Sequence, residues 1–195
     1  THLASLEGDY SLDESCVAIV GEIENIQDRF VLSLYNDLCA NGKMLLKLVA
    51  LMHQASPNYV SSANIFRSYC AKLDLLQKTI NMGINLIKNQ NQLIDILSEP
   101  ISEPTMLNLV SSIKEKQALK LLYILTYARL KARNLNHFSD IDNAKLRQIY
   151  DSALSAFDSD ESLMDSVNKR TKKIELLKKQ REFIALDKDI KEQIL

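Results

Sequence analysis

The sequence predicts an all-α protein, an elongated multi-helix bundle of about seven or eight helices built around a long central helix over residues 64–98. Only 4 Gly and 3 Pro occur in the 195 residues, so turns are few and long helices are favoured. Alternating runs of Val, Ile and Thr are nearly absent, which excludes a substantial β-sheet.

The stretch 64–98 has the longest helical pattern in the chain. Its apolar stripe is wider than a coiled-coil seam, so we expect helices on two sides; a homodimeric coiled coil is the alternative. We expect Gly83 to cause a mild bend rather than a close backbone approach. We expect Gln90 to mark the point where the helix becomes solvated, rather than a buried residue that sets the register. The two heptad series are Phe66, Leu73, Ile80, Ile87, Ile94 and Tyr69, Leu76, Gly83, Gln90, Leu97.

This register places Leu76 in the core and Lys78 on the outer face. Leu76→Asp is therefore expected to abolish cooperative unfolding, because it would bury an unpaired charge. Lys78→Ala is expected to change the stability by no more than about 0.5 kcal/mol.

Before this stretch, an apolar stripe predicts a first helix over residues 12–40. Asn41 and Gly42 then supply a left-handed helix end. A shorter apolar helix is expected over residues 43–54.

After it, Pro100 and Pro104 indicate a minor break near residues 99–104. Residues 118–130 are apolar almost all round, which is typical of a helix in the middle of a bundle. An amphipathic helix near residues 146–157 follows. The last helix is expected over residues 162–181 or beyond, with its cap at residues 158–161.

The 3 Cys residues (Cys16, Cys39 and Cys70) are an odd number, and each lies among apolar residues on a helical face. We therefore predict that the thiols are buried and that they form no disulfide framework. This favours a reducing compartment, intracellular or cytoplasmic. No signal-peptide pattern or apolar run of membrane-spanning length is present. A start at Thr1 and an end inside an amphipathic pattern lead us to expect one helical domain, residues 1–195, excised from a longer protein.

The strongest local charge feature is a run of basic residues near the C-terminal end. On a helix, such a run can bind the phosphates of an anionic membrane or an acidic protein; a solvated outer face is the competing interpretation. Nucleic acid is disfavoured, because the formal net charge is only −1 and few aromatic residues accompany the run. The candidate surface consists of Lys169, Arg170, Lys172, Lys173, Lys178, Lys179 and Arg181.

Catalytic and metal-binding patterns are missing from the sequence. His2, His53 and His137 have no partners at metal-ligand spacing, so neither a metal site nor another cofactor is expected. Cys39 and His53 could meet across the Asn41–Gly42 turn, but no orienting residue supports a nucleophile there. We therefore interpret Cys39 as a core residue and His53 as a histidine whose ring nitrogens have hydrogen-bond partners.

These observations predict a non-enzymatic helical interaction module, a scaffold whose surface binds a protein partner. The alternative is a peripheral membrane or phosphoinositide-binding domain that uses residues 169–181. An enzyme with an unfamiliar site is a third class.

Overall fold

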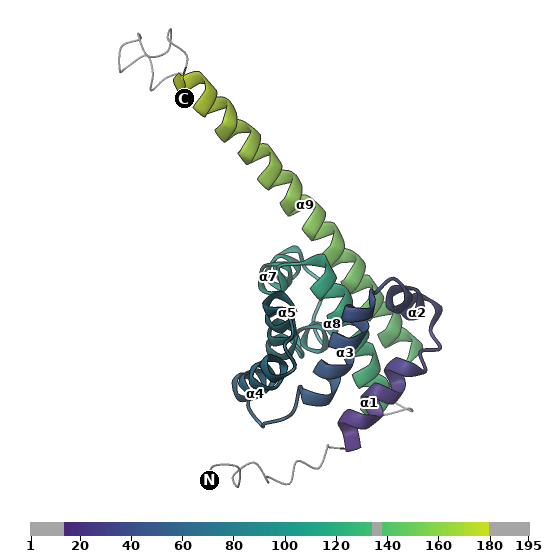
Figure 1. Ribbon diagram of the computed structural model, residues 1–195. Helices are drawn as coiled ribbons and strands as arrows, with labels where there is room; N and C mark the ends of the chain where they lie inside the picture. Colours follow the sequence, from purple (N-terminus) through teal and green to yellow (C-terminus); the bar gives the residue numbers. More distant parts are fainter. Residues whose placement is uncertain (1–13, 134–137, 180–195) are drawn as a thin grey trace, which may run out of the picture. The chain divides into compact units, whose positions relative to one another are not determined.

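The computed structural model describes residues 14–133 and 138–179, with side chains up to residue 159. All regular secondary structure in these residues is helical (Figure 1), which confirms the predicted all-α multi-helix bundle. The chain divides into two units, Thr1–Ala153 and Leu154–Leu195. The side-chain contacts described below all lie within the first unit.

The helices follow one another through short connections. In chain order they are α1 (Glu14–Glu24), α2 (Arg29–Asn36), α3 (Ala40–Met52), α4 (Tyr59–Lys72), α5 (Gln77–Lys88), α6 (Gln92–Leu97), α7 (Glu103–Ile113), α8 (Lys116–Arg133) and α9 (Asp140–Lys179).

The first unit is built around α8. Every residue from Leu121 to Arg129 is buried, and α1, α2, α3, α5, α6 and α7 all pack against this helix. The central position predicted for residues 118–130 is therefore confirmed. A helix without a polar face reaches this degree of burial only when neighbours surround it.

The predicted continuous helix over residues 64–98 is wrong, because the chain reverses direction after α4. Asp74 adopts a left-handed conformation with φ 54°, and its N–H donates to the carbonyl of Ala71 at 3.2 Å. The Leu75 N–H donates to the carbonyl of Cys70, also at 3.2 Å. These two bonds form a Schellman motif, which ends α4 and lets α5 fold back against it.

The reversal overturns the predicted heptad register. Leu76 was expected in the core, but it lies at the start of α5 with 73% of its surface exposed. Leu76→Asp is therefore no longer expected to abolish cooperative unfolding. The prediction for Lys78, which is exposed, is unaffected.

Gly83 of α5 packs directly against a side chain of α4. A Cβ atom at this position would lie 2.3 Å from Cζ of Phe66, far inside the contact distance. The buried Phe66 ring thus occupies the space that a side chain would need. The mild bend preferred from the sequence is replaced by a packing role.

The predicted helix over residues 12–40 is also divided. α1 ends at Glu24, and α2 begins after Asp28, whose carboxylate accepts hydrogen bonds from the N–H groups of Phe30 and Val31. Asn41 and Gly42 do not end a helix; they lie in the first turn of α3, which begins at Ala40.

Near the C-terminal end, the sequence predicted a break between helices where the structure has none. The sequence predicted two helices separated by a cap at residues 158–161, whereas α9 runs without a break from Asp140 to Lys179. Residues with good capping chemistry also occur inside helices, where their side chains can face solvent.

Gly83→Ala is expected to lower the free energy of unfolding by about 1–3 kcal/mol, because the methyl group must displace the Phe66 ring. Gly21→Ala is the matched control: nothing lies within 4 Å of a Cβ there, in α1. Gly21→Ala should raise the free energy of unfolding by up to about 1 kcal/mol, because Ala has a higher helix propensity than Gly. Urea denaturation of both variants measures the difference, and equal effects would contradict the close contact at Gly83.

Candidate functional site

The basic run predicted as a candidate surface lies beyond residue 159, where the structure describes no side chains. Residues 169–179 belong to the backbone of α9, and Arg181 lies outside the described residues. The prediction of an anionic-ligand or partner surface at these residues therefore remains a prediction.

The thiol beside His53 is that of Cys16, not that of Cys39 as considered from the sequence. His53 Nδ1 lies 3.9 Å from the Cys16 sulfur and 2.9 Å from the carbonyl oxygen of Ala50. Cys16 and His53 are both buried, so no substrate can reach them. Cys70 is buried as expected, and burial raises the pKa of its thiol. Cys39 is exposed, which corrects the prediction that all three thiols are buried.

Metal binding and membrane insertion find no support in the described part of the chain. Across residues 14–133 and 138–179, no three His, Cys, Asp or Glu residues are grouped so that they could hold a metal ion. No helix in the same ranges combines the length and apolar character needed to cross a membrane.

A buried polar network joins α8 to the break between α5 and α6. The Arg129 guanidinium donates to the backbone carbonyl of Gln90 at 2.6 Å and to Oδ1 of Asn91 at 3.0 Å. The Gln90 side chain donates to the carbonyl of His53 at 3.2 Å. Gln90 is therefore buried rather than solvated, which is the reverse of the preferred prediction.

This network holds a positive charge inside the unit, and no carboxylate among the described side chains forms an ion pair with it. Burial lowers the pKa of Arg129 to about 10, with repulsion by Arg133 as a further cause, so the guanidinium stays protonated at neutral pH. The carbonyls at the C-terminal end of α5 carry the negative end of that helix dipole and compensate the charge. Arg129 thereby stabilises the α5–α6 break, and we interpret the network as structural.

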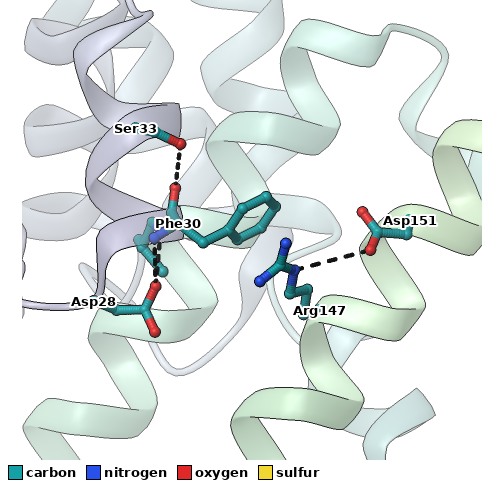
Figure 2. Close-up of polar contacts among 6 residues, drawn as sticks. Asp28, Phe30, Ser33, Arg147 and Asp151 are labelled. Carbon is teal, nitrogen blue, oxygen red and sulfur yellow. Dashed lines mark hydrogen bonds and ion pairs between the residues drawn. The ribbon is translucent and has the colours of Figure 1, made fainter.

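A second cluster joins α9 to α2 and α8; two of its members, Phe30 of α2 and Arg147 of α9, are drawn in Figure 2. The rings of Phe30, Tyr123 and Tyr150 pack together with centroids 4.8–5.9 Å apart. The Arg147 guanidinium lies over the Phe30 ring, 4.1 Å from its centroid. Such aromatic and cation–π contacts each add about 0.5–1.5 kcal/mol beyond burial.

Asp28 lies beside this cluster and connects two helices. One carboxylate oxygen caps α2, and the other accepts a hydrogen bond from the amide of Asn143 at 3.0 Å. Partial burial acts to raise the pKa of Asp28. The hydrogen bonds from Val31, Asn143 and Phe30 outweigh it, so the pKa lies below its ordinary value.

A cavity of about 170 Å³ lies beside Cys39, with Lys78, Met82 and Gln117 in its lining. Cavities that bind small molecules usually enclose about 300–1,000 Å³. The cavity is too small to support a ligand site without a further indication.

The candidate functional site is an exposed apolar surface at the turn between α4 and α5. Tyr69 and Leu73 are each 49% exposed, and Leu76 is 73% exposed. We call these three residues the hairpin tip. Exposed apolar side chains that lie close together in the chain at one end of a hairpin are a candidate interaction surface.

Sequence reasoning placed all three hairpin-tip residues in the core. One signal could have located the turn. Leu73, Leu75 and Leu76 are too closely spaced for one narrow helix face to bury together, and Asp74 between them is a residue type that tolerates a left-handed conformation.

Comparisons with protein-family models, with curated proteins and with solved structures found no match to this chain.

Asp28→Ala is expected to lower the free energy of unfolding by about 1–2 kcal/mol at neutral pH, because the two N–H groups of α2 lose their acceptor. Asp28→Asn is the matched control, since its amide oxygen can still cap the helix.

The comparison between the parent chain and Asp28→Asn also isolates the charge. A lowered folded pKa means that the carboxylate contributes stability above the unfolded pKa and loses it as the pH falls through the folded pKa. The stability difference between these two proteins should therefore shrink as the pH falls from about 6 to about 2. Denaturant titrations at several pH values measure it, and a constant difference would contradict the lowered pKa.

Proposed function

We propose that this chain is a non-enzymatic helical module that binds a protein partner through the hairpin tip. The observation that carries the proposal is the exposure of Tyr69, Leu73 and Leu76 at the end of one helical hairpin. Exposing large apolar side chains to water is unfavourable, by roughly 25 cal/mol for each Å² of apolar surface. A protein partner that covers them would recover this free energy.

The position of the hairpin tip favours a binding role over a packing role. α4 packs on α3 and α5, and Phe66 and Cys70 on its inner face are buried. Tyr69 and Leu73 lie outside that inner face, so they add little to the packing of the first unit. Rigid helices on a fixed core present such side chains at little conformational cost, which favours binding.

Site-specific cross-linking tests the proposal. A photoreactive phenylalanine analogue placed at Leu76 is expected to form a discrete protein adduct in a lysate of the natural source. Leu73→Asp in the same chain should abolish the adduct, because it places a charge in the apolar contact. Leu107→Asp is the matched control, since Leu107 is exposed on α7, away from the turn.

Stability measurements make this experiment interpretable. Leu73→Asp and Leu107→Asp should each change the free energy of unfolding by no more than about 0.5 kcal/mol, as is usual for exposed positions. An adduct that survives Leu73→Asp, or no adduct at all, would overturn the hairpin tip as the contact surface.

The alternative function is binding to an anionic membrane surface through residues 169–181. The observation that favours it is that α9 carries residues 169–179 on one uninterrupted helical backbone. Vesicles that contain anionic lipid should co-sediment the chain, and changing Lys172, Lys173, Lys178 and Lys179 together to Glu should abolish this. Co-sedimentation that is unaffected by the four changes would exclude the lipid role.

A further inference from the structure

The net charge of the α4–α5 hairpin differs in sign from that of α1 and α2. Residues 59–88, which include α4 and α5, contain four basic side chains and one acidic one, a net charge of +3. Residues 14–37, which include α1 and α2, contain five acidic side chains and one basic one, a net charge of −4. The α4–α5 hairpin is thus basic, like residues 38–58 before it, which hold Lys43 and Lys47 and no acidic side chain, whereas α1 and α2 are acidic.

Two of these cations adjoin the hairpin tip. Lys72 directly precedes Leu73, and Lys78 follows Leu76 by two residues; both side chains are exposed. In the part of the chain that the structure describes, neither lysine has a carboxylate partner, whereas Lys47 and Lys120 pair with Glu24 and Asp37.

Helix stability does not account for both lysines. Lys72 lies in the last turn of α4, where a cation is favourable. Lys78 lies in the first turn of α5, where the helix dipole opposes a positive charge. An acidic group on a partner would compensate this unfavourable position.

The form of the partner follows from the form of the surface. No strand edge exists in residues 14–133 and 138–179 to which an extended peptide could add. Tyr69 and Leu73 are one helical turn apart at the end of α4, and the exposed Leu76 stands at the start of α5, three residues after Leu73. A second helix with apolar residues at the same spacing matches this surface.

We infer that the partner of the hairpin tip is an acidic amphipathic helix, whose apolar stripe covers Tyr69, Leu73 and Leu76 and whose carboxylates meet Lys72 and Lys78. This inference rests on the proposed function, because it specifies the chemistry of the partner at the same surface. Charge complementarity of this kind raises the association rate and selects the partner.

Fluorescence polarisation with the full chain and two synthetic peptides tests the inference. The first probe is a labelled peptide of about 18 residues, long enough to form a helix, with Leu at helical spacing on a background of Glu and Ala. The second has Lys in place of each Glu. The acidic peptide is expected to bind at least tenfold more tightly, and its affinity should fall about tenfold between low and high salt.

Charge reversal in the chain supplies the matched variants. The double variant Lys72→Glu, Lys78→Glu should bind the acidic peptide at least tenfold more weakly than the parent chain, and it should bind the basic peptide more tightly. Lys88→Glu is the control, because Lys88 is an exposed residue at the opposite end of α5. It should change either affinity by no more than about twofold.

Each result decides between the inference and its alternatives. Equal binding of both peptides, or no binding of the acidic one, overturns the acidic partner. If the acidic peptide does not bind but the cross-linker at Leu76 still captures a protein, the inference about the acidic partner is overturned and the proposed function stands. If the cross-linker captures no protein either, the inference and the proposed function are both overturned. A concentration-dependent dimer in light scattering that Leu73→Asp abolishes would show that a second copy covers the hairpin tip, and this too overturns the acidic partner.

Discussion

The structure of the first unit depends on the enclosure of α8. A helix that is apolar on every side can be stable in water only if other helices cover all of it, and here α1, α2, α3, α5, α6 and α7 share this task. Burying α8 also buries the charge of Arg129, which needs hydrogen-bond acceptors because an unpartnered buried charge costs several kcal/mol. The backbone carbonyl of Gln90 and the side chain of Asn91 supply its hydrogen bonds, so the α5–α6 break and the burial of α8 require one another.

At two of the breaks between helices, polar side chains form hydrogen bonds with backbone groups at the helix ends. Asp28 satisfies the first N–H groups of α2 and at the same time accepts a hydrogen bond from Asn143 of α9. Asn89 donates to the carbonyl of Asn85 at the end of α5. The start of α2 and the end of α5 are thus held by side-chain hydrogen bonds, and packing of the apolar faces alone does not describe the bundle.

The parts of the fold that follow from apolar periodicity could be predicted from the sequence. The all-α class and the central position of residues 118–130 need only the count of Gly and Pro and an apolar surface on all sides. The break at Asp28 could not be predicted, because an aspartate that caps a helix resembles one on an exposed helix face. The break at Asp74, where φ is 54°, left one weak signal, the close spacing of the leucines around an aspartate. The hairpin tip exists only because of the second break, so it was missed together with that break.

The turn at Asp74 also means that this sequence encodes a competing conformation. The heptad series still runs through Leu73 and Leu76, so a straight helix across the turn would carry a continuous apolar seam. A left-handed residue other than Gly costs about 1 kcal/mol, and the seating of Phe66 on Gly83 is the contact that favours the reversed chain. Opening of this hinge would release α4 to pack on another molecule, so the contact of Phe66 with Gly83 opposes domain swapping.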